Sequence, residues 1–287
     1  MKTDGLFTVG RFTIPVKSNK PVRLVFFGDV HRDSPNHAKK AWMEFLAYAR
    51  GLKDAWFLGM GDYLDSTSSS ERACLGHITD TLHETLSKDL NALQAEKVKL
   101  MAKELGFMRG RLVGLVGGNH YWQFAHGGTS DTELARLLGC QYLGVSSFVR
   151  ITFDCFGRES TLDIWAHHGA GASRLPGGSI NRVDQMREFA EADIYAMGHD
   201  HKRGVIPATP RLFLDRNSKT GLKLKHRQQW LIRSGSFLAS YEDGVSNYNV
   251  DAARGPCSLG HVELIINVDQ SAKGRGEPAE ITIRGLS

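Results

Sequence analysis

The sequence lacks the features that mark membrane-spanning, secreted or thiol-dependent proteins. Its 287 residues contain only four cysteines, Cys74, Cys140, Cys155 and Cys257. No two of them form a Cys-x-x-Cys pair, which argues against a zinc ribbon and against a redox dithiol. The first sixteen residues lack the apolar stretch of a signal peptide, and no segment is long and apolar enough to cross a bilayer. We therefore expect a reduced, cytoplasmic protein with no membrane partner.

Neither sign of charge is in large excess, and the sequence has no internal repeat or low-complexity tract. The chain carries 36 Lys and Arg against 31 Asp and Glu, a net charge of +5. This mild basic excess suits an anionic substrate, but it serves equally well as a general solubility charge. With 41% hydrophobic and 23% charged residues, the composition is that of an ordinary globular protein. We expect one domain over residues 1–287.

The apolar pattern predicts alternating strands and helices in the first two hundred residues. The first unit is a strand, a helix and a strand at 22–27, 35–52 and 55–58, which implies a parallel pair of strands. Further strands are predicted at 112–116, 142–153, 161–166 and 194–197. Further helices are predicted at about 70–105, 130–138 and 181–190. Beyond residue 201 strands prevail, at 205–214, 228–232, 262–268 and 281–283. The fold class is therefore α/β.

Polar residues of a kind that binds metal ions gather in five short segments. These are Gly28-Asp29-Val30-His31, Gly61-Asp62, Gly118-Asn119-His120, Ala166-His167-His168-Gly169 and Gly198-His199-Asp200-His201. Four of the five follow a run of apolar or β-type residues, where α/β folds place their chemistry. Asp29 and His31 are two residues apart, so in an extended segment both side chains point to the same side. His199 and His201 repeat this spacing, and the two oxygens of Asp62 are suited to bridging two ions.

Taken singly, these residues are weak evidence. A lone histidine is more often structural than a metal ligand, and Gly-Asp pairs are common in turns. The combination is far more specific, because chance would have to place five such segments in order, each near the end of a predicted strand.

This ordered set resembles the calcineurin-like metallophosphoesterase superfamily, over roughly Leu24 to His201. The continuation Asp62-Tyr63-Leu64-Asp65-Ser66, the Gly-rich loop after the His pair and Gly235-Ser236-Phe237 are similar to members found in phage and prophage genomes. The resemblance implies a four-layer α/β/β/α sandwich with a dinuclear metal site at the carboxyl ends of the strands. Residues 202–287 would then be mainly strands that complete the second sheet.

The resemblance also implies which residues hold two divalent metal ions. It assigns the first ion to Asp29, His31 and His201, the bridging role to Asp62, and the second ion to Asn119, His199 and one of His167 and His168. We favour His168 because it directly precedes Gly169, and His167 stays an alternative. Imidazole and carboxylate ligands without thiolate suit Mn, which we expect first, and also Zn, Fe, Co or Ni.

The resemblance makes Asp62 and His120 the catalytic residues, with His120 stabilising charge or protonating the leaving oxygen. Family members commonly continue Gly-Asn-His with Asp or Glu, which orients the histidine, whereas Tyr121 follows here. Some other group must therefore orient His120. Asp65 stands where the family often has an acidic residue, and we interpret it as a partner of the site that does not bind the metal itself.

The implied reaction is hydrolysis of a phosphate ester by a hydroxide that bridges the two metals. We favour a phosphodiester, in a nucleotide or nucleic acid, over a phosphoprotein. The alternatives are a phosphomonoesterase or protein phosphatase, and a noncatalytic metal-binding interaction module of the same fold. Substrate contacts are predicted for Arg32, His126, Arg174 and Lys202, each of which would equally suit a solvent-facing position. The sequence makes no prediction of the oligomeric state.

Overall fold

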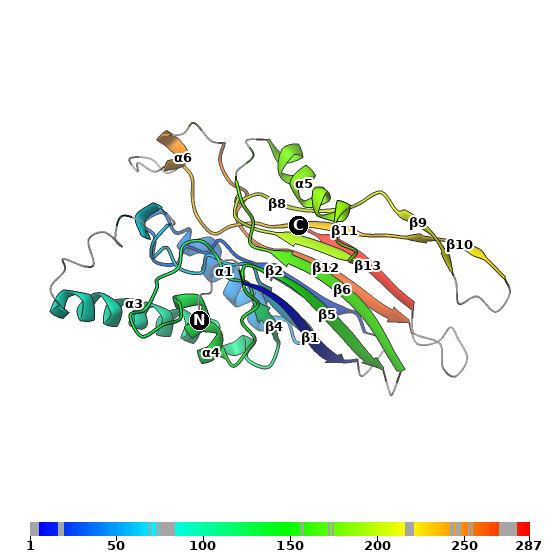
Figure 1. The fold of residues 1–287 in the computed structure, drawn as a ribbon, viewed down its shortest axis with the longest axis horizontal. Coiled ribbons are helices and arrows are strands. Elements are labelled where there is room, and N and C mark those ends of the chain that lie inside the picture. Colours follow the sequence, from blue (N-terminus) through cyan, green and yellow to red (C-terminus); the bar gives the residue numbers. More distant parts are fainter. Residues whose placement is uncertain are drawn as a thin grey trace.

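Two β-sheets form the centre of the molecule in the computed structural model (Figure 1). The structure describes residues 6–16, 20–68, 70–72, 74, 84–155, 158–171, 173, 175–215, 221–241, 244, 248–251, 253, 255–269 and 280–287. The five-stranded sheet has the order β13-β12-β2-β3-β4, and the six-stranded sheet the order β1-β5-β6-β7-β11-β8. The α/β class predicted from the sequence is confirmed.

In the five-stranded sheet, the three strands that lead into the polar motifs run parallel to one another. The strands are β2 (Val22–Phe27), β3 (Ala55–Gly59), β4 (Leu112–Leu115), β12 (Val262–Asp269) and β13 (Glu280–Leu286). β2 and β4 both pair in parallel with β3, and β12 is antiparallel to β2. The carboxyl ends of β2, β3 and β4 therefore lie at the same edge of this sheet.

The six-stranded sheet brings a second set of strand ends to the motifs. Its strands are β1 (Phe7–Pro15), β5 (Ser146–Cys155), β6 (Arg158–His167), β7 (Ile194–Met197), β8 (Arg203–Pro207) and β11 (Trp230–Ser234). β6 and β7 are parallel neighbours, and β8 is antiparallel to β11. The strands after residue 202 are divided between the two sheets, and β9 (Arg211–Asp215) with β10 (Lys223–Arg227) forms a separate two-stranded sheet.

Three apolar clusters define the layers. Buried residues of both sheets, among them Leu24, Phe26 and Ile164, share one core. Val25 and Phe27 belong to a second core with α1 (Lys39–Gly51), α3 (Glu84–Glu104) and α4 (Ser130–Leu138). A third core joins the six-stranded sheet to α5 (Pro176–Asp184). Because neighbouring side chains of β2 alternate between two buried faces, this strand reads as a continuous apolar run.

Several predicted boundaries differ from the observed ones. The helix predicted from residue 35 begins at Lys39, because residues 34–37 form a turn and the Ala38 N–H donates to Phe237 O over 2.7 Å. The helix predicted over 181–190 starts earlier, because α5 begins at Pro176, a favourable first helical residue, and ends at Asp184. The 3-10 helix η2 (Gln185–Glu188) follows it directly, so most of the predicted range is helical.

The strand predictions also need correction at three places. The strand predicted at 205–214 is two strands, β8 and β9, in different sheets. The strand predicted at 228–232 corresponds to β11, and β10 precedes it as an additional strand. The edge strand β1 was not predicted.

The long helix predicted from about residue 70 is described as α3 from Glu84 onward, and residues 75–83 lie outside the described part. Among the described residues, no helix combines the length and apolarity needed to cross a membrane.

Candidate metal centre

Five strand ends deliver polar side chains to one region of the molecule. β2, β3 and β4 are followed within four residues by Asp29, Asp62 and Asn119, respectively. On the facing sheet, His168 comes directly after β6 and His199 two residues after β7. Parallel packing of these strands thus brings together segments that are far apart in the sequence.

The first group of ligand atoms comes from Asp29, His31 and His201, whose donor atoms lie within 4.8 Å of one another. Nε2 of His201 is 3.5 Å from Oδ1 of Asp29. Burial raises the pKa of Asp29 to about 7 despite the nearby His168, and burial also lowers the pKa of His201 well below its usual value. A neutral imidazole beside a poorly compensated buried carboxylate suits a cation between them.

His31 supplies a direct sign that this group fits a metal ion. Its Nε2 is buried and has no hydrogen-bond partner among the described residues. Its other ring nitrogen, Nδ1, lies 3.2 Å from Oδ1 of Asp65. Leaving a buried ring nitrogen unsatisfied costs about 1–3 kcal/mol, a cost that a bound cation would remove.

The second group joins Asp62, His168 and His199, and Asn119 contacts both histidines. Asn119 Oδ1 is 2.9 Å from His168 Nε2 and 2.8 Å from His199 Nδ1, and Asp62 Oδ2 is 3.2 Å from His168 Nε2. His168 Nδ1 faces the Met60 carbonyl at 2.8 Å and donates to it, so Nε2 points at two oxygen acceptors. Burial lowers the pKa of His168, but the Asp62 charge and hydrogen bond outweigh it and raise this pKa to about 10. The pocket therefore favours a positive charge at this position.

Asp62 lies between the two groups. Its Oδ1 accepts the backbone N–H groups of Asn119 and His120, over 2.7 and 2.9 Å. Its Oδ2 faces His168 on one side and Nε2 of His31, 3.8 Å away, on the other. Burial acts to raise the pKa of Asp62, yet the neighbouring histidines hold it well below its usual range. The carboxylate is thus ionised and placed to serve both groups.

Backbone strain is concentrated in these segments. Apart from Ala253, the non-glycine residues with positive φ in the described chain all belong to the two groups: Asp29 (46°), His31 (45°), Asp62 (51°), His199 (74°) and His201 (58°). Left-handed backbone costs roughly 1–2 kcal/mol for such residues and persists where the surroundings impose it. Strain of this kind, repeated at five positions of one site, is typical of functional centres.

The glycines of the motifs allow the close approach of these segments. A Cβ atom at Gly118 would overlap the Asp62 carboxylate, and one at Gly61 would overlap Nδ1 of His168. Gly61 also has a φ of 99°. A side chain at Gly118 would push this segment away from Asp62, and a side chain at Gly61 would push its segment away from His168.

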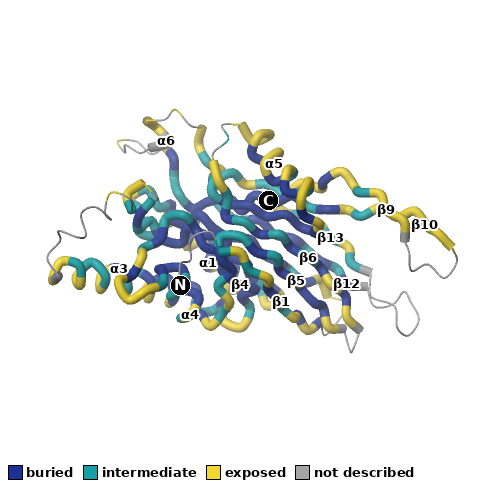
Figure 2. Tube along the Cα trace, in the orientation of Figure 1, coloured by how far each residue is buried: buried dark blue, intermediate teal, exposed yellow. Residues whose placement is uncertain are grey.

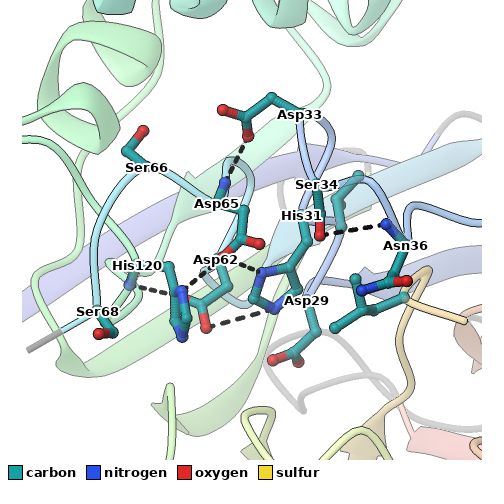
Figure 3. A network of polar contacts seen from close by, with 12 residues as sticks. Asp29, His31, Asp33, Ser34, Asn36, Asp62, Asp65, Ser66, Ser68 and His120 are labelled. Atoms are coloured by element: carbon teal, nitrogen blue, oxygen red, sulfur yellow. Dashed lines mark hydrogen bonds and ion pairs between the residues drawn. The ribbon is translucent and has the colours of Figure 1, made fainter. Parts of the chain in front are cut away.

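Asp65 is the group that orients His120 (Figure 3). Its Oδ1 lies 2.7 Å from Nδ1 of His120, and the same oxygen approaches Nδ1 of His31. Burial acts to lower the pKa of His120, but the Asp65 hydrogen bond and the charge of Asp62 raise it. Asp65 is itself held in place, because Asp33 accepts its backbone N–H over 2.5 Å. Tyr121 instead lies under the guanidinium of Arg72, 3.8 Å from the ring centroid.

The structure separates the two neighbouring histidines. His168 lies in the second group, whereas His167 Nδ1 accepts the backbone N–H of Gly169 over 2.7 Å and belongs to neither group. Consecutive residues at the end of an extended strand point to opposite sides, so only one of the pair can reach the centre.

The predicted substrate contacts that the structure describes each have different surroundings. The Arg32 guanidinium is bound by Glu104 through both Nε and Nη2, over 3.0 and 2.8 Å. His126 stacks on Phe124, with ring centroids 5.2 Å apart. Lys202 is half-buried directly after His201. Arg174 lies outside the described residues.

Two supporting residues were not predicted from the sequence. Arg233 donates through Nη1 to Gly198 O over 2.8 Å, and its Nη2 lies 3.0 Å from the buried Asp200. It thereby holds the turn that carries His199 and His201. Asp131 accepts the Gly118 N–H over 2.8 Å. Nothing in the sequence singles out Arg233, and Asp131 lies at the start of the helix predicted at 130–138.

Asp131 leads to a testable prediction about stability. Burial raises its pKa to about 6, so the folded protein binds a proton here that the unfolded chain releases near pH 3.8. The free energy of unfolding should therefore fall by about 3 kcal/mol as the pH rises from about 4 to about 6, through this group alone. Asp131→Asn keeps an acceptor for Gly118 and should lack this fall. Urea unfolding of both proteins in the presence of a chelator measures it; a difference between them that does not change with pH would contradict the assignment.

Comparisons with known proteins add little to this geometry. Neither a scan against protein-family models nor a search of curated proteins gives a match. Among solved structures, the chain is similar to the NAD nucleotidase NadN of Haemophilus influenzae, with 12% sequence identity and a TM-score of 0.40. The similarity covers 92% of this chain and 49% of the nucleotidase, so this chain spans about half of that structure's length. The functional argument therefore depends on the site itself.

Proposed function

We propose that this chain is a calcineurin-like metallophosphoesterase, a single domain that hydrolyses a phosphate ester with the help of two divalent metal ions. The observation that carries the proposal is the convergence of carboxylate, amide and imidazole groups from five strand ends, on backbone that is strained at five of the ligand positions. The layer order of helices, two sheets and helix agrees with the four-layer sandwich of that superfamily.

The donor atoms divide between two ions. We assign one ion to Asp29, His31 and His201, the other to Asn119, His168 and His199, and a shared position to Asp62. When bound, such ions polarise phosphoryl oxygens and lower the pKa of a coordinated water to about 7. Mn is the metal we propose first, and Zn, Fe, Co or Ni would also suit a set of imidazole and oxygen ligands without thiolate.

The residues beside the metals have separate tasks. The Asp65 carboxylate engages Nδ1 of His120, so a protonated His120 presents its Nε2–H for donation to the leaving oxygen. The His120 side chain is 26% exposed, which leaves it accessible from the solvent side. Asp65 and Asp62 raise its pKa against the opposing effect of burial, and this favours the protonated ring. Asp65 is thus a positioning residue, and His120 is the proton donor.

A phosphodiester is the substrate class we propose, in a nucleotide or nucleic acid. The test is hydrolysis of bis-p-nitrophenyl phosphate and of p-nitrophenyl phosphate with added Mn. We expect higher kcat/KM for the diester, and no turnover with either compound after chelation. Preference for the monoester would favour a phosphatase instead.

The competing proposal is a noncatalytic metal-binding module of the same fold. Such a module would have no need to keep His120 paired with Asp65 at 2.7 Å. If two bound metals are measured and neither ester is hydrolysed, the catalytic proposal is refuted and the module is favoured.

A further inference from the structure

A two-stranded ribbon projects from the body of the molecule, at the right of Figure 1. Among the strands that the structure describes, β9 and β10 pair only with each other, with Leu214 opposite Leu224 and Leu212 opposite His226. Directly paired residues share one face of a ribbon, so Leu212, Leu214 and Leu224 lie on the same side. Figure 2 shows both strands coloured largely as exposed.

The leucine side of this ribbon is open to solvent. The exposed fractions are 61% for Leu212, 54% for Leu214 and 60% for Leu224, and Leu222 beside them is 77% exposed. An isolated two-stranded ribbon is at best marginally stable in water, and a group of neighbouring exposed leucines marks an interaction surface. A partner that covers these leucines would therefore stabilise the ribbon.

The same segment carries the charge excess of the whole chain. Residues 211–227 contain six of the 36 Lys and Arg and one of the 31 Asp and Glu, which leaves 30 of each sign elsewhere. At the base of the ribbon, Arg211 and Arg227 are paired with Glu191 over 2.8 and 3.0 Å. Lys223 and Lys225, farther out on β10, are exposed and alternate with the leucines.

We propose that this ribbon binds the surface of an anionic lipid bilayer, a partner that was not predicted from the sequence. The leucines would enter the interface between head groups and acyl chains, and the lysine stems would carry their ammonium groups to the lipid phosphates. Neighbouring strands are only about 4.8 Å apart, so lysines of a two-stranded ribbon can reach around its edge to the same depth.

Other partners would account either for the exposed leucines or for the positive charge, but not for both. A second copy of the chain would cover the leucines but would bring together two segments that each carry the full positive excess. A nucleic acid would neutralise the charge but leave the leucines in water. An anionic lipid surface satisfies both, which is why we favour it.

The ribbon lies away from the metal centre. β8 starts at Arg203, two residues after His201, and runs outward to Pro207 before β9 begins. Five strand residues span roughly 17 Å, so lipid binding would leave the candidate site open. This inference is independent of the proposed enzymatic function, and its test needs no metal.

The test is sedimentation of the full chain with vesicles of phosphatidylglycerol and phosphatidylcholine, compared with vesicles of phosphatidylcholine alone. We expect binding to the anionic vesicles only. A variant with Leu212→Ser, Leu214→Ser and Leu224→Ser should lose more than about tenfold in affinity. Lys223→Gln with Lys225→Gln should lose about fivefold per lysine at low salt, and less at high salt.

The matched control is Leu175→Ser with Phe189→Ser, two other residues that are 72% and 70% exposed. This control should bind vesicles as the unchanged protein does, and circular dichroism should show that all variants fold. Equal binding by the leucine variant would overturn the proposal. The absence of vesicle binding would also overturn it. In that case, loss of a dimer in light scattering in the leucine variant would identify a second copy as the partner. Loss of DNA retention in this variant would identify a nucleic acid.

Discussion

Asp62→Asn is expected to lower the turnover of bis-p-nitrophenyl phosphate by at least about a thousandfold, because it removes the one carboxylate that serves both proposed metal ions. The asparagine can still accept the two N–H groups of Asn119 and His120, so the turn should persist. What it loses is the negative charge that faces His168 and His31. Initial rates test the loss of turnover, and titration calorimetry with elemental analysis tests the loss of bound metal.

The control for this variant is Asp131→Asn. Asp131 is also a buried aspartate that holds the Gly118 turn, but it faces neither group of ligand atoms. We expect it to retain two bound ions and most of the activity. Two tightly bound ions in Asp62→Asn would refute the bridging role, whatever its turnover.

Asp65→Asn is expected to lower activity by about a hundredfold toward diesters with poor leaving groups, and much less toward p-nitrophenyl esters. The reason is that an alkoxide leaving group needs a proton from His120, whereas p-nitrophenolate leaves readily without one. The carboxylate raises the pKa of His120, and only the protonated ring can donate. Removing the charge lowers that pKa, so the loss of activity with rising pH should move to lower pH.

A series of leaving groups and the pH dependence of kcat separate this effect from a general loss of folding. Adding His120→Asn to Asp65→Asn should cause little further loss, because the two residues act as a unit. Glu71→Gln is the control: this nearby carboxylate accepts the Ser68 N–H and makes no contact with His120 that the structure describes. An equal loss for every leaving group would contradict the positioning role of Asp65.

Local sequence pattern determined much of the fold. The strands at 22–27 and 194–197 were predicted with the boundaries that the structure has, because each is a short apolar run flanked by turn residues. The α/β class followed from the alternation of such runs with helical stretches. The five polar segments stood out for the same reason, since their position at strand ends can be read from neighbouring residues.

Tertiary structure alone decided how those segments meet. The choice between His167 and His168 depends on which way each side chain leaves the end of β6, and the partner of His120 is Asp65, which reaches it from the loop after β3. The left-handed backbone at the ligand positions, the support of the His199 turn by Arg233 and the separation of β9 and β10 from both sheets are likewise absent from any local pattern. Periodicity reports how a residue relates to its neighbours along the chain, whereas these features arise from packing between distant segments, which no single window of sequence encodes.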